Sequence, residues 1–542
     1  MILNHLKIIL LSCLIVVKCL DVDPAKTKVF GLGLHPEKAV YPVRYFFIEA
    51  YDSAGIRLNH SVGEKAFSVQ VEGDVDSGTY CRVWVQVLDR YDGSYIVRYR
   101  TYQTCHNMRI NVLYLSQHVS DSPYKISEPV YPESCYCPEG TLEEWLTVAG
   151  CPASVPQVEE DLAPFPAVHF SEVLREAKDR YYRPAARSFC HYVVKTNEIY
   201  RHCYGQHVDF KMFMDNMLLS MARKMVLPDT EFIINLGDWP LVEKKQLPPI
   251  PVFSWCGSDD TADIVLPTYD ITETTLEMMG RHDHNTCHLF GCSELVTPLS
   301  PLVLWDSPIE AAGLLARWGE RVTLDMLSVQ SNNAVPWSKK KPIAFWRGRD
   351  SRQERLDLIS LARDHPDLFN VSLTNFFFFR DQEEQYGPKQ KHVSFFEFFN
   401  YKYQINIDGT VAAYRLGYLL GGTGVVLKQD SSYYEHFYKQ LKPNVHYLPF
   451  KRDLSDLVQK IEWARANDDA VLAMSKAGRQ FVLENLMPKD IFCYHAVLLQ
   501  KWSQRLTEKV VIRPGMDHVA REDNEKRFGS CQCHRLLGHD EL

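Results

Sequence analysis

One carboxylate in this sequence stands where a catalytic group is expected. The apolar run 231–236 predicts a strand that ends in Gly237-Asp238-Trp239, and Pro240 stops the run. Ligands of parallel α/β sheets gather outside the carboxyl ends of the strands, so Asp238 is a candidate general base. An aspartate between glycine and a Trp-Pro pair also suits an ordinary turn. The pattern alone leaves both interpretations open.

Two other stretches combine arginines with small residues in a way that suits a phosphate. The run Pro342–Trp346 predicts a strand, Arg347–Arg355 a tight turn, and the next residues a helix. Tyr403–Ile407 predicts a second strand, followed by a helix start at Thr410–Tyr414 with Arg415 beside it. A helix N-terminus near an arginine can bind a phosphate. Each junction alone could be an ordinary connection with surface arginines, but together they predict a nucleotide site.

Three longer stretches carry a resemblance to a known family: RGRDSRQER at 347–355, YQINIDGTVAAYR at 403–415 and YYEHFYKQLKPNVHYLPF at 433–450. They resemble the capsule-associated-protein family of glycosyltransferases, and within it the KDEL-motif-containing protein O-glucosyltransferases, along nearly the whole chain. Such enzymes move glucose, sometimes xylose, from the UDP-sugar to serine of EGF-like repeats in secreted or membrane proteins such as Notch-type receptors and extracellular matrix proteins. The resemblance implies a metal-independent, inverting α/β GT-B enzyme with two Rossmann-like lobes facing across a cleft.

The resemblance also implies roles for individual residues. Asp238 matches the family's catalytic aspartate, while Arg355 and Arg415 would neutralise the UDP diphosphate on the second lobe. Arg349 and Asp350 depart from the Ser-Arg of shorter relatives, so the donor preference is not carried over. The expected UDP-sugar site comprises Arg347, Gly348, Arg349, Ser351, Arg355, Thr410, Val411, Ala412, Ala413, Tyr414 and Arg415. The alternative function is a catalytically inactive ER lectin or chaperone-like binding protein.

The two ends of the chain predict its compartment. Residues 1–20 have the apolar core of a secretory signal peptide, and the chain ends in the retrieval sequence His539-Asp540-Glu541-Leu542. We therefore expect an ER-lumenal protein that binds the ER-retrieval receptor and is not inserted in the membrane. The 60 basic and 68 acidic residues do not indicate nucleic acid. Asn59 and Asn370 begin N-glycosylation sequons.

Domain boundaries follow from changes in pattern. Residues 21–130 alternate apolar and polar positions between turns, which predicts an all-β immunoglobulin-like sandwich. The segments at 23–27, 92–95 and 121–126 resemble a filamin repeat. The glycosyltransferase domain is expected at 131–505 with an atypical insertion at 282–321. Residues 506–542 are predicted to be a charged tail, mobile from Glu508.

Several motifs resemble metal sites, and we predict that none is one. Asp74-Val75-Asp76 spells a DxD motif but lies in the sandwich, where a solvated turn is expected. His191, His202 and His207 fall in a stretch that we interpret as loop-rich and bounded by cysteines at 190 and 203. The chain has 15 cysteines, of which thirteen follow the signal peptide, so we expect several disulfides and at least one cysteine without an intramolecular partner. Cys81 and Cys105 could pair.

Overall fold

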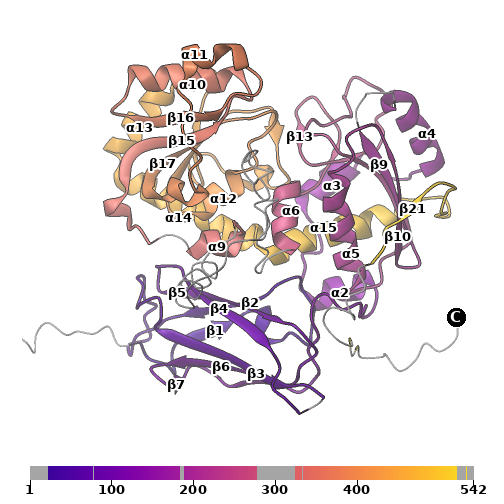
Figure 1. Cartoon of the computed structure of the whole chain (residues 1–542), viewed down its shortest axis with the longest axis vertical. Helices are drawn as coiled ribbons and strands as arrows, with labels where there is room; N and C mark the ends of the chain where they lie inside the picture. The colour runs from indigo at the N-terminus through magenta and orange to yellow at the C-terminus, as the bar shows by residue number, and fades with distance from the viewer. Residues whose placement is uncertain are drawn as a thin grey trace, which may run out of the picture. The chain divides into compact units, whose positions relative to one another are not determined.

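The computed structural model describes residues 22–76, 78–182, 188–276, 324–331 and 334–521, together with Cys531 and Cys533. The predicted signal peptide, the insertion at 282–321 and the tetrapeptide His539–Leu542 therefore lie outside the described residues. The chain divides into two compact units (Figure 1). The first contains Arg44–Pro132 and most of the chain before it, and the second contains Glu133–Arg527 and Cys533. Each unit is described by itself below.

The first unit is a sandwich of two antiparallel sheets, which confirms the all-β prediction. One sheet has the strand order β1-β2-β5-β4, and the other has β3-β6-β7 with β8 also paired to β6. Inward side chains such as Phe46, Val97 and Ile110 form one core, while polar residues alternate outward along β3. The strands are β1 (Lys28–Phe30), β2 (Arg44–Glu49), β3 (Phe67–Asp74), β4 (Val83–Asp89), β5 (Ser94–Thr101), β6 (His106–Tyr114), β7 (Gln117–His118) and β8 (Tyr124–Ile126).

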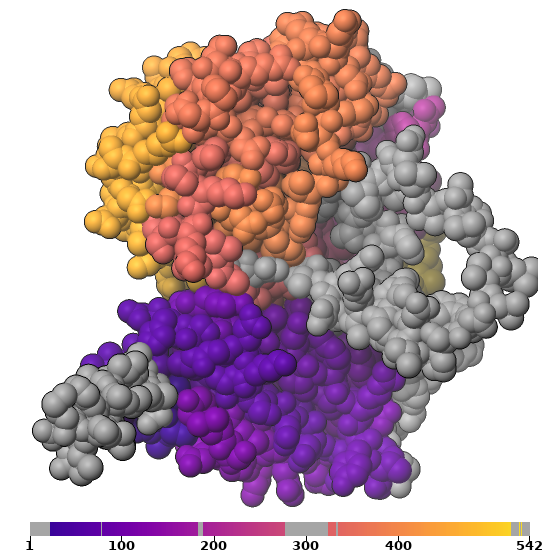
Figure 2. Space-filling view, turned by 60° about the vertical axis from the view of Figure 1, so that its left-hand side comes forward, coloured from indigo at the N-terminus to yellow at the C-terminus, as the bar shows by residue number. Residues whose placement is uncertain are grey.

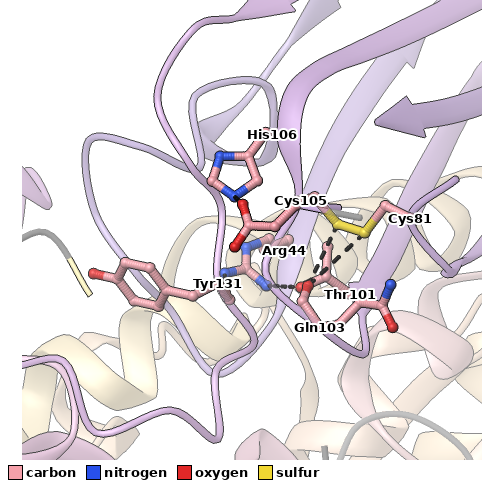
Figure 3. The surroundings of a disulfide bond; sticks show 8 residues. Arg44, Cys81, Thr101, Gln103, Cys105, His106 and Tyr131 are labelled. Atoms are coloured by element: carbon pink, nitrogen blue, oxygen red, sulfur yellow. Dashed lines mark hydrogen bonds and ion pairs between the residues drawn. A yellow bond between two sulfur atoms is a disulfide. The ribbon is translucent and has the colours of Figure 1, made fainter. Parts of the chain in front are cut away.

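A disulfide joins Cys81 to Cys105 in this unit, as the sequence allowed (Figure 3). The two sulfur atoms lie 3.8 and 3.4 Å from the Gln103 carbonyl oxygen. Nearby, Arg44 donates to the Thr101 hydroxyl at 3.4 Å and to the Tyr131 carbonyl at 2.5 Å (Figure 3). The DxD motif begins at Asp74, the exposed last residue of β3, and continues into a turn in which the exposed Asp76 pairs with His106 at 3.0 Å. The prediction of a solvated turn is confirmed.

The second unit begins with a six-stranded sheet in the order β14-β12-β11-β9-β10-β21, which we call the first lobe. Strands β11, β12 and β14 are parallel, but β9, β10 and β21 are antiparallel, so only part of this sheet matches the Rossmann-like prediction. The reason is local: Thr196 and Asn197 have φ of 53° and 58°, which makes a tight hairpin turn between β9 and β10. The strands are β9 (Phe189–Lys195), β10 (Glu198–Tyr204), β11 (Thr230–Asn235), β12 (Phe253–Ser254), β14 (Ile264–Val265) and β21 (Asp517–His518).

That hairpin corrects one further prediction. His191 and His202 are partners on β9 and β10 and do not lie in a loop-rich stretch, and a disulfide links their neighbours Cys190 and Cys203. Helices pack around this sheet (Figure 1): α2 (Leu142–Val148), α3 (Pro156–Leu162), α4 (Phe170–Tyr181), α5 (Lys211–Ala222), α6 (Tyr269–Leu276) and α15 (Pro488–Ser503).

The second lobe is an all-parallel sheet in the order β16-β15-β17-β18-β20, and it matches the predicted strand-helix alternation. Its strands read as apolar runs because helices cover them, and the core includes Trp346, Ile405 and Leu427. Figure 2 shows an outer face of this lobe in salmon, orange and yellow. The elements are α9 (Met326–Ser331), β15 (Lys341–Arg349), α10 (Gln353–Asp364), β16 (Phe369–Asn375), α11 (Glu383–Tyr386), β17 (Tyr401–Asn406), α12 (Leu416–Gly421), β18 (Val425–Gln429), β20 (Leu448–Phe450), α13 (Leu457–Ala466) and α14 (Asp468–Asn485).

The two lobes are joined at their strand ends. Strand β13 (Gly257–Ser258), which follows β12, pairs antiparallel with β19 (Tyr433–Tyr434) of the second lobe. A hydrogen bond between the Thr274 and Tyr418 hydroxyls, 2.9 Å apart, also crosses between the lobes. Residues that follow β11 and β12 are therefore held close to residues of the second lobe.

The segment after α15 is packed, so the prediction of a mobile tail from Glu508 is wrong for the described residues up to 521. Strand β21 pairs with β10, and Arg513 forms an ion pair with the fully buried Glu231. Further along, Cys533 is disulfide-bonded to Cys137, which ties the chain end to the start of this unit. High charge did not imply mobility here, because the charged side chains have partners on the first lobe.

Candidate active site

Asp238 lies in the turn after β11, at the carboxyl end of the parallel strands, as predicted. Its side chain is half-buried, and its Oδ1 atom is buried without a hydrogen-bond partner among the described residues. Burial raises the pKa of the Asp238 carboxyl above its ordinary value, while the positive charge of Arg349 opposes that rise. A carboxylate with an unpaired oxygen and a raised pKa is suited to accept a proton.

Arg349, at the end of β15, is the arginine of the second lobe whose charge reaches Asp238. The same charge also acts on Tyr269 of the first lobe and on Arg355 and Arg415 of its own lobe. Its side chain is exposed, and its guanidinium makes no hydrogen bond or ion pair with the residues that the structure describes. Arg349 is therefore free to bind an anion beside Asp238.

Arg347 and Gly348 have structural roles in strand β15. The Arg347 guanidinium donates to the Trp346 carbonyl at 2.8 Å and to the carbonyl and side-chain oxygens of Asn370 at 2.8 and 2.6 Å, so it ties β15 to β16. Gly348 is required by packing, because a Cβ there would lie 2.4 Å from the Trp346 ring. The structure does not give either residue a side chain that is open to a ligand.

Arg355 is buried and its guanidinium is used within the protein. It donates to the carbonyls of Asp408, Arg349 and Ile407 at 2.7, 2.9 and 3.1 Å, and to the Ser351 hydroxyl at 3.2 Å. These bonds brace the ends of β15 and β17 against each other. Burial, followed by repulsion from Arg415, lowers the pKa of Arg355. The geometry therefore gives Arg355 and Ser351 a shaping role, with the charge of Arg355 still close to the site.

The expected helix start at Thr410–Tyr414 is wrong, because α12 begins only at Leu416. Residues 409–415, which we call the donor loop, are non-helical. The Gly409 amide donates to the Val411 carbonyl at 2.9 Å, and the Asn406 side chain donates to the Ala413 carbonyl at 3.2 Å. These two bonds hold a compact turn where the small residues had indicated a helix.

The donor loop nevertheless offers backbone donors. Within the described part of the chain, the amides of Thr410, Val411, Ala412 and Ala413 donate to no acceptor. Val411, Ala412 and Ala413 are also buried, with 2%, 5% and 5% of their surface exposed. Buried amides are nearly always paired, and successive open amides form a concave site for anions. Residues 410–413 are therefore suited to bind an anion, although they form a loop and not the predicted helix start.

Arg415 and Tyr414 complete the donor loop. One Nη of Arg415 donates to the Arg347 carbonyl at 2.7 Å, and burial together with the charge of Arg349 lowers the pKa of Arg415. The Tyr414 ring lies edge-on to Tyr269 of α6, with centroids 5.5 Å apart. Asp238 and the donor loop are therefore brought to one place from the two lobes.

Two residues of this site, Arg352 and Tyr269, were not predicted from the sequence. Arg352 lies on the same motif as Arg349 and Arg355, and its guanidinium stacks 5.1 Å from the Tyr433 ring centroid and approaches Asp408 at 3.7 Å. The repeated arginines of that motif were the available signal. Tyr269 follows β14, and only the parallel pairing of β11, β12 and β14 reveals its position.

The remaining predicted residues lie elsewhere. Asn59 is exposed in the sandwich unit and is accessible to a glycan. Asn370 is half-buried in β16, where its amide donates to the Tyr401 hydroxyl at 2.8 Å and its oxygen accepts from Arg347. This geometry disfavours a glycan at Asn370. Among the helices of the described residues, none has the length and apolar character that spanning a bilayer requires.

Comparison with known families identifies the class of protein. The family described as Glycosyl transferase family 90 matches residues 147–296 and 311–532, and the Filamin/ABP280 repeat matches residues 21–125. The unmatched residues 297–310 lie within the predicted insertion. The chain belongs to glycosyl transferase family 90 and is a glycosyltransferase with an N-terminal filamin repeat.

The chain is similar to named proteins along most of its length. It is 45% identical to Protein O-glucosyltransferase 2 of Danio rerio, over 96% of this chain and 94% of that protein. It is 41% identical to Protein O-glucosyltransferase 3 of Homo sapiens, over 95% and 93%. Protein O-glucosyltransferase 1 of Homo sapiens is 29% identical over 72% of this chain and 86% of that protein.

Proposed function

We propose that this chain is a protein O-glucosyltransferase that moves glucose, or xylose, from the UDP-sugar to serine of EGF-like repeats. The observation that carries the proposal is one juxtaposition: the open carboxylate of Asp238 lies with Arg349 and with a donor loop of unpaired amides. The similarity to the protein O-glucosyltransferases supports the choice of sugar and acceptor class.

The second lobe binds the donor in this proposal, as in the GT-B arrangement. Arg349, the remaining N–H groups of Arg415 and the amides of 410–413 hold the diphosphate, and Arg355 and Ser351 keep the loop in shape. Several cationic groups crowded in a partly buried place repel one another, and a diphosphate relieves that repulsion. The same groups stabilise UDP as it leaves.

Asp238 is the general base of the first lobe. The serine oxygen attacks the anomeric carbon from the face opposite to UDP and forms the new C–O bond, while the serine proton passes to the Asp238 carboxylate. The old bond to the phosphate oxygen breaks, and UDP departs with its electron pair. The configuration at the anomeric carbon is inverted from α to β.

The acceptor approaches over Trp239, which follows Asp238 and leaves 52% of its surface exposed. An exposed indole in a fixed turn beside the base offers apolar area and a hydrogen-bond donor at low entropic cost. EGF-like repeats are the acceptor class that the family resemblance implies.

The proposed compartment is the ER lumen. The disulfides Cys81–Cys105, Cys151–Cys493 and Cys190–Cys203 require an oxidising environment, which agrees with the predicted signal peptide and retrieval tetrapeptide. Deleting residues 539–542 should release the protein into the medium of expressing cells. Retention at the undeleted level would contradict the retrieval assignment.

The reaction is tested by incubating the purified protein with a folded EGF-like repeat and, separately, with UDP-glucose, UDP-xylose and other UDP-sugars. Mass spectrometry should detect one added hexose or pentose on the serine. A protein that binds the repeat and UDP but adds no sugar from any donor would instead be an inactive binding protein.

A further inference from the structure

The turn that carries Asp238 is held by side chains from beneath it, beginning with Asn235 at the end of β11. Asn235 is fully buried, and its Oδ1 accepts from the Gly237 amide at 2.9 Å. Its Nδ2 donates to the Trp239 carbonyl at 2.7 Å and to the Ser254 hydroxyl at 3.1 Å. A single amide side chain therefore fixes the backbone on both sides of Asp238.

Asp263 holds the far end of the same turn. Its carboxylate accepts from the Leu241 amide at 2.8 Å and from the Val242 amide at 2.9 Å. The Ser254 hydroxyl donates to Asp263 at 2.6 Å while it accepts from Asn235. Ser254 thus connects the two groups that hold the turn, and Ser254 and Asp263 are both almost completely buried.

Cys256 provides a third contact, directly at Asp238. Its thiol donates to the Asp238 carbonyl at 3.4 Å, and among the described residues Cys256 is a free cysteine, buried below the turn. Burial raises the pKa of this thiol, so it stays protonated and remains a donor. The backbone of residues 237–242 is thereby held at five atoms by three buried side chains.

These buried side chains bond to the backbone of the turn and not to the Asp238 carboxylate. Buried polar networks whose members are all paired specify one geometry. The Asp238 carboxylate receives none of these bonds, and its Oδ1 atom has no hydrogen-bond partner among the described residues. We propose that Asn235, Ser254, Asp263 and Cys256 are positioning residues that aim the Asp238 carboxylate at the acceptor hydroxyl. This proposal rests on the role of Asp238 in the proposed function.

Ser254→Ala is the most informative variant, because it removes the connection between Asn235 and Asp263 with little change in volume. The bond from Asn235 to Trp239 and the bonds from Asp263 to the backbone remain possible. Ser475→Ala is the matched control: Ser475 is a buried serine on α14 that donates to the Gly424 carbonyl at 3.0 Å, remote from Asp238 in the fold.

The experiment is a double-mutant cycle on the full chain, with transfer to an EGF-like repeat as the readout. Because small misplacements of a catalytic group are costly, Ser254→Ala should lower kcat about tenfold at unchanged KM for the UDP-sugar. In an Asp238→Asn background the same substitution should change the residual rate less than about twofold, since no base is left to aim. Ser475→Ala should change neither rate.

Three results would overturn the proposal. They are an equal loss in both backgrounds, no loss in the wild type, and a raised donor KM in place of a lowered kcat. If Ser254→Ala does not fold, Cys256→Ala is tested in the same cycle with the same expectations, and failure of both to fold would assign the network to folding alone. Full activity of Asp238→Asn by itself is a different result, because it would overturn the proposed function as well.

Discussion

The turn at 236–242 and the donor loop at 409–415 follow strands of the two lobes and differ in how their backbones are satisfied. In the turn, buried Asn235, Cys256 and Asp263 pair with five backbone atoms. In the donor loop, four successive amides have no acceptor within the described part of the chain. Within the turn, the amides of Leu236, Gly237, Leu241 and Val242 are paired without a ligand, and among the described residues those of Asp238 and Trp239 are not. The donor loop has the longer run of unpaired amides.

This difference indicates a division of labour. A general base must be held in position within fractions of an ångström, and a network of buried, hydrogen-bonded side chains can hold it there. An anion site must instead keep donors unpaired until the anion arrives, which costs stability in the free protein. The predictions below test this division.

The largest effect is expected for Asp238→Asn, which keeps the size of the side chain but removes the basic oxygen. Because general-base catalysis contributes ~100- to 10,000-fold, transfer should fall by about that factor. The measurement is the initial rate of sugar transfer per folded molecule. Asp260→Asn, an exposed aspartate of the same lobe, is the control and should retain its rate. A near-normal rate for Asp238→Asn would falsify the catalytic assignment.

The next largest effect is expected in the donor loop. Hydrogen bonds to charged groups are worth ~1.5–3 kcal/mol, so Arg415→Ala should weaken UDP binding by at least about tenfold. Isothermal titration of UDP measures this. Arg363→Ala serves as the control, because Arg363 of α10 also donates to backbone carbonyls, at Gln385 and Gly387, but does so outside the site. Equal UDP affinity for wild type and Arg415→Ala would contradict the proposal that the donor loop binds UDP.

A smaller effect connects the two regions through Arg349. Burial raises the pKa of Asp238 and Arg349 lowers it, so Arg349→Gln should raise that pKa further. The base works only when ionised, so the acidic limb of the kcat/KM profile should move to higher pH. Arg175→Gln, on an exposed position of α4, should leave the profile in place. A limb that stays in place or moves to lower pH would contradict an action of Arg349 on the Asp238 pKa.

The smallest effect concerns stability. An aspartate whose pKa is raised on folding holds its proton more tightly in the folded state, so the wild type loses stability as pH rises through that pKa. Asp238→Asn has no such loss and should be as stable as the wild type or slightly more stable at neutral pH, by about 1 kcal/mol or less. Thermal unfolding at neutral and acidic pH measures the difference. A clear decrease in the stability of the variant at neutral pH would indicate that the carboxylate has a structural partner.

Part of the fold and the position of Asp238 could be predicted from the sequence, because they depend on patterns of neighbouring residues. The alternating strands of the sandwich, the parallel second lobe and the placement of Asp238 after an apolar strand all depend on neighbouring residues. The disulfide between Cys81 and Cys105 spans only 24 residues. The resemblance to the family then assigned the stretches at 347–355 and 403–415 together to the UDP-sugar site.

The rest depends on contacts that a local pattern does not contain. Arg355 reaches carbonyls 52 and 53 residues away, so its arginine-rich motif gave no sign that its donors were already used. Small residues at 409–413 indicated a helix start, but the Asn406 side chain holds the segment as a turn. The packing of residues 507–521 depends on Glu231 and Glu198 of the first lobe, more than 270 residues earlier.

The most direct test of the division between the two regions is hydrogen–deuterium exchange of the full chain with and without UDP. The account predicts that peptides covering 409–415 become protected when UDP binds, because the open amides of 410–413 acquire a diphosphate acceptor. The amides of Leu236, Gly237, Leu241 and Val242 should exchange slowly in both states, since they are already paired. Saturating UDP that leaves 409–415 unprotected, or that protects 236–242 instead, would contradict the account.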